Sequence, residues 1–253
     1  MKRFLKRIIL IFSPLIRGDF KSFTLEMKLW GPEVYKRYIW RKHCEGFLLL
    51  SPDTLPEGAA KGLYQEFYKK DFVKISGQNE LVDFCNNVKS TEPVTDEFGR
   101  TKTILTGLTS EALERHTSPI VSEVLRLIYG RPFWIRDKAF IMEHSPNKAK
   151  DHIQADWHVD GYNQVTLTLL LKDSQQDPVA TEMMAGSSKT PWPFDRRLVE
   201  VGDDYETAKF SGKKGDLFIF FGGGALHRSY IGSSGRKAVF VNLSSGWYES
   251  GLI

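Results

Sequence analysis

The strongest constraint on the fold is a change in hydrophobic period near Phe133. Before this point apolar residues recur at helical spacing, most clearly over residues 108–129, where Pro119 indicates a division into two helices. After it, short apolar runs alternate with clusters of Gly, Pro, Asn and Asp, a pattern typical of short β-strands. A helical first half followed by many short strands predicts an α+β fold in which helices flank a double-sheet jelly roll.

The individual elements follow from the same patterns. Helices are expected over 33–47, 59–70, 79–88 and 108–129, the last of them capped by Thr109 or Ser110. Strands are expected over 72–75, 133–144, 157–160, 165–172, 181–185, 209–210, 216–221 and 237–245. The polar, glycine-containing stretch 92–107 is expected to form a loop or lid over the site.

Charge divides the chain into two parts. Residues 1–42 hold eleven Lys and Arg against three acidic residues, whereas the whole chain of 253 residues has a net charge of only +4. We therefore expect a basic N-terminal extension, residues 1–50, followed by a jelly-roll domain, residues 51–253. An extension this basic fits an anionic partner such as a membrane surface.

The first seventeen residues leave three interpretations open. Their apolar run is too short to span a bilayer, which needs roughly 20 residues. The segment fits an amphipathic anchor on a membrane surface, a first helix packed on the main domain, or a cleaved signal. Interleaved aromatic and basic residues over 33–47 could grip nucleic acid, but a surface helix is the favoured interpretation, and no nucleic-acid partner is expected.

Two cysteines, Cys44 and Cys85, lie far apart and match no metal-binding spacing. Reduced structural thiols of this kind are typical of a cytoplasmic protein. With the basic extension, the expected location is cytoplasmic and peripheral on a membrane. The sequence does not indicate an oligomeric state.

One short run, 155–162, carries the clearest chemical signal. It places His158 and Asp160 two positions apart. In an extended strand, side chains at positions i and i+2 point to the same face, so the imidazole and the carboxylate would point together. These two groups are one ligand short of the 2-His-1-carboxylate arrangement that binds non-haem Fe(II) and leaves coordination positions open.

A third ligand is expected from a distant strand. Residues 215–221 read as a buried strand that runs into a glycine cluster and then reaches His227. Arg236 follows nine positions later, at the start of another apolar run. A fixed guanidinium near a metal suits a dicarboxylate, because it binds a carboxylate as a bidentate fork.

This order of His-x-Asp, distal His and Arg resembles the Fe(II)/2-oxoglutarate-dependent dioxygenases, and more narrowly the phytanoyl-CoA dioxygenase group. Trp157 before the first ligand, the turn 184–189 and Ser229 support the narrower resemblance, which covers roughly residues 130–245. Ala185 and Ser188 depart from the usual Pro and His of that turn. Neither departure falls among the expected metal ligands.

The resemblance implies a cupin-like jelly-roll enzyme in which His158, Asp160 and His227 bind Fe(II). Arg236 and Ser229 would hold 2-oxoglutarate, and O2 would be the second co-substrate. The implied reaction is hydroxylation of a small or lipid- or phosphate-linked metabolite, with release of succinate and CO2. Asp160 favours hydroxylation over halogenation, because related halogenases lack this carboxylate.

Other polar residues have less specific expectations. His144 and His152 flank a lysine-rich loop and are expected at the surface or entrance, and Asp216 is expected to shape the start of its strand. Thr168 could face the cofactor, and Asn163 and Gln164 could line the substrate side. The competing function is a non-catalytic jelly roll that binds a metal or ligand and associates with a membrane through its basic arm.

Overall fold

The computed structural model describes residues 52–55, 57–129, 133–135, 138–145, 156–160, 164–189 and 205–245. All of them belong to Phe47–Ile253, the second of two units into which the chain divides. The expected basic extension, residues 1–50, with its helix over 33–47 and Cys44, lies outside the described residues. Within the described part of the chain, no helix is long and apolar enough to cross a bilayer.

Among the described residues, four α-helices and one short 3-10 helix, η1 (Pro52–Thr54), precede most of the strands. The α-helices are α3 (Ala59–Lys70), α4 (Asn79–Asn87), α5 (Ser110–His116) and α6 (Pro119–Tyr129). The predicted break at Pro119 is confirmed, because α5 ends at His116 and a new helix starts at the proline. Thr109 is the cap of α5: its hydroxyl accepts a hydrogen bond from the Ala112 backbone N at 3.2 Å.

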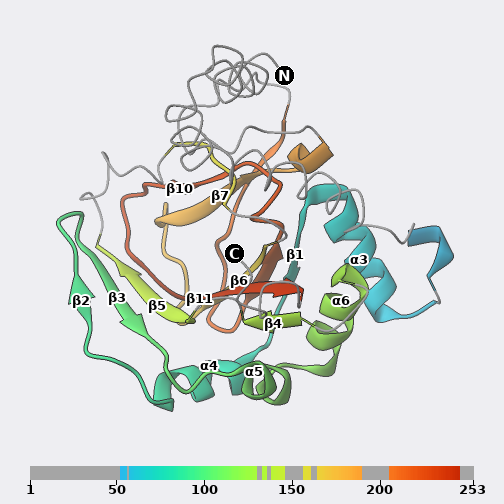
Figure 1. Ribbon diagram of the computed structural model, residues 1–253. Coiled ribbons are helices and arrows are strands. Elements are labelled where there is room, and N and C mark those ends of the chain that lie inside the picture. The colour runs from blue at the N-terminus through green and yellow to red at the C-terminus, as the bar shows by residue number, and fades with distance from the viewer. Residues whose placement is uncertain are drawn as a thin grey trace, which may run out of the picture. The chain divides into compact units, whose positions relative to one another are not determined.

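The strands of the described part of the chain form two antiparallel sheets (Figure 1). The main sheet contains β1 (Phe72–Ile75), β2 (Val94–Thr95), β3 (Arg100–Ile104), β4 (Phe133–Ile135), β5 (Phe140–His144), β6 (Val165–Leu170), β9 (Leu217–Phe220) and β11 (Arg236–Ser245). Its order is β1-β9-β6-β11-β5-β3-β2, with β4 paired to β11. The second sheet has the order β10-β7-β8, from β7 (Ala180–Met184), β8 (Thr207–Lys209) and β10 (His227–Tyr230).

Alternation along the strands gives the main sheet two different faces. In β6, Val165, Leu167 and Leu169 are at most 2% exposed, and they point away from the side on which Thr166 lines a cavity. Helices cover this apolar face: the Tyr129 hydroxyl of α6 accepts a hydrogen bond from the Val165 backbone N at 3.2 Å. Figure 1 shows α3 and α6 beside β1 and β4, which they contact.

An apolar cluster joins the two sheets on the opposite side of the main sheet. Phe210, which follows β8, stacks on Phe218 of β9 with ring centroids 4.6 Å apart, and Met183 of β7 belongs to the same cluster. Phe220 belongs to this cluster and also lines the cavity. The cluster therefore fills one part of the space between the sheets, and the cavity lies beside it.

The expectation of a loop over 92–107 was wrong. Residues 94–104 form a β-hairpin, β2 and β3, which extends the main sheet by pairing β3 with β5. Asp96 shapes its turn by accepting hydrogen bonds from the backbone N atoms of Phe98 and Arg100, both at 3.0 Å, and Gly99 takes a positive φ of 69°. Strand β3 carries no apolar alternation, so its pairing with β5 rather than its own composition makes it a strand.

Candidate metal centre

His158 and His227 are joined through their backbones. The N atom of each residue donates a hydrogen bond to the carbonyl O of the other, both at 3.0 Å, in a local antiparallel bridge. His227 begins β10, whose partner β7 holds it in the second sheet, and His158 lies outside the named strands. The bridge brings two histidines that are distant in sequence to adjacent positions.

Both imidazoles are held in the orientation that metal binding requires. Nδ1 of His158 lies 2.7 Å from the carbonyl O of Asp156, and Nδ1 of His227 lies 3.1 Å from that of Ala225. A carbonyl oxygen can only accept, so each Nδ1 carries a proton, and in the neutral imidazole this leaves the lone pair on Nε2. Hydrogen bonds of this kind fix the ring and the tautomer of metal-binding histidines.

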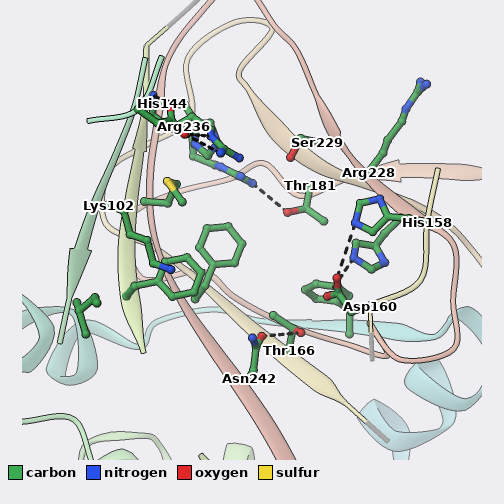
Figure 2. A pocket seen from close by; sticks show the side chains of 18 of the residues that line it. Lys102, His144, His158, Asp160, Thr166, Thr181, Arg228, Ser229, Arg236 and Asn242 are labelled. Carbon is green, nitrogen blue, oxygen red and sulfur yellow. Dashed lines mark hydrogen bonds and ion pairs between the residues drawn. The ribbon is translucent and has the colours of Figure 1, made fainter. Parts of the chain in front are cut away.

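The two Nε2 atoms converge on the carboxylate of Asp160 (Figure 2). His158 Nε2 lies 3.7 Å from Asp160 Oδ1, and His227 Nε2 lies 3.3 Å from Oδ2. One ligand atom from each of the three residues lies within 4.8 Å of the others, so the group could hold one metal ion. The expected strand over 157–160 was wrong, because only a single bridge forms at His158. The side chains of His158 and Asp160 nevertheless point in a common direction.

A polar network orients the Asp160 carboxylate. Gln164 Nε2 donates to Asp160 Oδ2 at 3.0 Å and also lies 3.1 Å from Thr166 Oγ1, which donates to Asn242 Oδ1 at 3.1 Å. Gly222 accepts a backbone hydrogen bond from Asp160 N at 2.8 Å, and a Cβ at this glycine would lie 3.1 Å from Asp160 Oδ2. Part of the glycine cluster is thus explained by the close approach of the carboxylate.

The turn after β7 supports the start of β10. Ser187, which begins the 3-10 helix η3 (Ser187–Lys189), accepts a hydrogen bond from Leu226 N at 2.8 Å. The next residue, Ser188, donates from its backbone N to Asp71 at 2.9 Å and from its hydroxyl to the same carboxyl group. Burial raises the pKa of Asp71 to about 6, although the hydrogen bonds from Ser188 and the charge of Lys189 act in the opposite direction. The serines of this turn thus fix the segment that leads into His227.

A cavity of about 580 Å³ extends from the three ligand residues between the two sheets. Arg236 lines it and is only 5% exposed. Its Nη1 donates to Thr181 Oγ1 at 3.0 Å, its Nε is buried without a hydrogen-bond partner, and no carboxylate of the described residues lies within ion-pair distance. Burial lowers the pKa of Arg236 to about 10, so the guanidinium remains protonated at neutral pH. A buried cation without a counter-charge inside a cavity is suited to an anionic ligand.

Ser229 is placed near this guanidinium. It lies opposite Thr181 in the register of β10 and β7, and both residues line the cavity. Figure 2 shows the guanidinium of Arg236 pointing across the cavity toward Thr181, with Ser229 on the same side as Thr181. The structure therefore brings all five residues singled out in the sequence to one cavity.

The surface position expected for His144 as one of two alternatives was wrong. It is only 5% exposed, and it lies in β5 opposite Arg236 of β11, where it lines the cavity. Its position next to a lysine-rich loop suggested the surface, but the sheet register places its side chain inward. Thr168 is fully buried and does not line the cavity, whereas Gln164 does. His152 and Asn163 lie outside the described residues.

Sequence reasoning missed the wall of the cavity that β3 and β5 form. Lys102 of β3 and Phe140 of β5 line the cavity together with Phe240 of β11. Alternation along β5 and β11 could have placed the two phenylalanines on the inner face. Lys102 had no such signal, since the hairpin that carries it was not recognised.

No protein-family model matches the chain, and no curated protein matches it. Solved structures do resemble it. EctD from S. alaskensis in its apoform gives a TM-score of 0.53 at 14% sequence identity, covering 76% of this chain and 79% of that chain. The same protein with bound Fe gives 0.50 at 11% identity, covering 76% and 78%. The non-heme alpha ketoglutarate dependent epimerase SnoN from nogalamycin biosynthesis gives 0.51 at 14% identity, covering 74% and 83%.

At these identities the likeness establishes the fold. The two antiparallel sheets with flanking helices are the cupin-like jelly roll of these Fe- and α-ketoglutarate-associated structures, as predicted. One of the similar structures is an epimerase, so the fold does not specify which reaction follows.

Proposed function

We propose that this protein is an Fe(II)- and 2-oxoglutarate-dependent oxygenase. The observation that carries the proposal is the unpaired guanidinium of Arg236 in the same cavity as the His158, Asp160 and His227 ligand atoms. A metal-binding group alone would fit many functions. A metal-binding group facing a cavity with a buried, uncompensated arginine fits a metal enzyme whose co-substrate carries a carboxylate.

The donor set fits Fe(II). Two neutral imidazole nitrogens and one carboxylate oxygen form the facial arrangement that non-haem Fe(II) oxygenases use, and they leave coordination positions open. Arg236 would hold the distal carboxylate of 2-oxoglutarate, with hydroxyl groups of Thr181 and Ser229 beside it. The unpartnered Nε gives the guanidinium a free donor for this purpose.

Fe(II) with 2-oxoglutarate and O2 supplies the oxidation of an unreactive C–H bond, coupled to release of succinate and CO2. The contribution of the chain is positioning. The carbonyl groups of Asp156 and Ala225 hold the imidazoles, Gln164 holds the Asp160 carboxylate, and the apolar cluster around Phe220 limits access of water from one side.

Finer proposals rest on the sequence motif. The spacing of His158, Asp160, His227 and Arg236 supports placement in the phytanoyl-CoA dioxygenase group. The carboxylate of Asp160 favours hydroxylation, and the basic extension is compatible with a small or lipid- or phosphate-linked substrate in the cytoplasm. We do not extend the acyl-CoA chemistry of that group to this chain, because substrate-facing loops vary on a shared barrel.

The test is an anaerobic titration of the purified protein with Fe(II), followed by 2-oxoglutarate. We expect one metal per chain and a visible charge-transfer band when 2-oxoglutarate is added, and then succinate formation that depends on O2. Arg236→Met should weaken 2-oxoglutarate binding roughly 100-fold, because a charge-assisted bidentate contact is lost. Lys237→Met changes the neighbouring residue, on the other face of β11, and should leave the affinity for 2-oxoglutarate unchanged.

Failure of the band to form in protein that binds one Fe(II) would contradict the proposal. It would favour the non-catalytic alternative, a jelly roll that binds a metal or another ligand without turnover.

Membrane association is a separate proposal that rests on the sequence of residues 1–42, which lie outside the described part of the chain. We expect the full chain to bind vesicles that contain anionic lipid, with binding that weakens as salt concentration rises. Deletion of residues 1–17 should abolish it. Binding that survives this deletion would contradict the proposal.

A further inference from the structure

The charges that line the cavity can be assigned one by one. Arg100 is neutralised by Asp96, whose Oδ2 lies 2.6 Å from Nη2 and 2.7 Å from Nε of the arginine. Arg228 is neutralised by Glu182, with two contacts at 2.7 Å. The Asp160 carboxylate belongs to the candidate metal centre. Two cations then remain among the described residues of the cavity, Arg236 and Lys102.

Lys102 has no carboxylate partner among the described residues, and its side chain faces the cavity. It lies on β3 in register with Met142 of β5, and both side chains line the cavity. Its Nζ is 4.2 Å from the centroid of the Phe140 ring, which holds the ammonium group against the cavity wall. Figure 2 shows this ammonium directed into the cavity from the side of β3.

The two cations contact different rings of one aromatic pair. Phe140 and Phe240 stack with centroids 5.5 Å apart and an interplanar angle of 17°. Lys102 lies over Phe140, whereas the guanidinium carbon of Arg236 lies 5.1 Å from the centroid of Phe240. Lys102 and Arg236 therefore provide two separate binding positions for negatively charged groups, with the apolar surface of the two phenylalanines between them.

This inference rests on the proposed function. A dianionic 2-oxoglutarate would place one carboxylate at Arg236 and the other at the metal. The metal would then face two carboxylates, that of Asp160 and that of 2-oxoglutarate, which together balance the charge of a divalent ion. That assignment uses every charge of the cavity except the one on Lys102. We propose that Lys102 binds a negatively charged group of the substrate, a carboxylate or a phosphate, and that an apolar part of the same molecule packs on Phe140 and Phe240.

The test uses the full chain loaded anaerobically with Fe(II) and 2-oxoglutarate, so that Arg236 is already occupied. The probes are phenylacetate, phenyl phosphate and the neutral phenylacetamide, and their binding is measured by calorimetry. The charged probes should bind about tenfold more tightly than the amide, because a hydrogen bond to a charged group distinguishes them. Whichever of the two charged probes binds more tightly identifies the carboxylate or the phosphate as the preferred group.

Lys102→Gln should reduce the preference for the charged probes to less than about twofold. Lys237→Gln is the matched control, because this lysine lies on the outer face of the same sheet and should keep the full preference. Lys102→Glu is a second variant, and it should favour phenethylamine over phenylacetate. A wild-type protein without preference, or a Lys102→Gln protein that retains it, would overturn the inference.

The two proposals can fail separately. A chelate band in wild-type and Lys102→Gln protein, together with an unchanged anion preference, would remove the role of Lys102 and leave the oxygenase proposal intact. If no band forms, the oxygenase proposal fails. The same probe titrations on protein with Fe(II) alone then decide whether anion binding depends on Lys102.

Discussion

The two faces of strands β6 and β11 differ in what their buried residues do. On the helix side, Val165, Leu167 and Leu243 are at most 1% exposed, and Leu243 lies opposite Val165 in the pairing of the two strands. On the cavity side the same two strands place Thr166, Arg236 and Asn242. Burial of apolar groups stabilises the fold, whereas burial of an unpaired guanidinium costs stability. One face of these strands therefore supports the structure, and the other holds the polar groups of the cavity, among them a guanidinium without a counter-charge in the described residues.

The largest expected effect is on the cavity side. His227→Ala should lower metal affinity roughly 1000-fold or more, since loss of an outer partner of a ligand alone costs about 10–100-fold. Metal content after dialysis would be measured, together with the free energy of unfolding of the metal-free protein. His116→Ala is the control, because this histidine pairs with Glu80 outside the cavity. Equal metal content in the two variants would contradict the assignment of His227.

Leu167→Ala addresses the helix side. Leu167 is 1% exposed, so its truncation should lower the free energy of unfolding by about 2–5 kcal/mol through lost burial and a residual cavity. Metal content and 2-oxoglutarate binding of the folded fraction should remain at wild-type values. Urea unfolding measures the first quantity, and the two binding titrations measure the second. A selective loss of metal binding would show that the two faces are not separable.

Asp71 tests whether a buried charge outside the cavity also costs stability. Its pKa in the folded protein is about 6, above the ordinary value of 3.8, so the folded state binds the proton more tightly. Stability from this group is complete below pH 3.8 and is lost as pH rises through 6, a decrease of about 3 kcal/mol. Asp71→Asn should flatten this part of the curve of unfolding free energy against pH. Parallel curves for the two proteins would contradict the raised pKa.

Arg236→Met should not lower the free energy of unfolding, in contrast to Leu167→Ala. Replacement of an unpaired, buried guanidinium by an apolar side chain should leave the free energy of unfolding unchanged or raise it by about 2 kcal/mol. The measurement is urea unfolding of the wild-type and Arg236→Met proteins without metal or 2-oxoglutarate. A clear loss of stability would mean that Arg236 serves the fold, and it would weaken the contrast between the two faces.

The smallest expected effect lies far from both faces, at the cap of α5. Thr109→Ala should cost about 1 kcal/mol, because Ala112 N loses its side-chain acceptor. Thr109→Ser keeps the acceptor and should cost less. Thermal unfolding of the three proteins gives the comparison, and equal transition temperatures would contradict the capping role.

Prediction from sequence succeeded where the signal was local. Helix α3 and the break between α5 and α6 follow from apolar spacing and one proline. The His-x-Asp pair, His227 and Arg236 could be selected because their residue types and spacing are unusual. Their convergence at one cavity could be expected only through the family resemblance, because no local pattern encodes the bridge between His158 and His227.

The failures share a physical cause. The hairpin of β2 and β3 is mostly polar and has no apolar alternation, and it becomes part of the sheet because β3 hydrogen-bonds to β5. His144 is buried because this register sets it between Arg100 and Arg236. Lys102 is directed into the cavity for the same reason. Strand pairing between remote segments decides these positions, and a single sequence does not show it.

The backbone bridge between His158 and His227 has a consequence for how a metal ion would bind the candidate centre. Four backbone atoms, rather than the ion, hold the two imidazoles side by side. An ion that enters the candidate centre would thus meet two imidazoles already held next to each other, and it would not have to draw the two segments together.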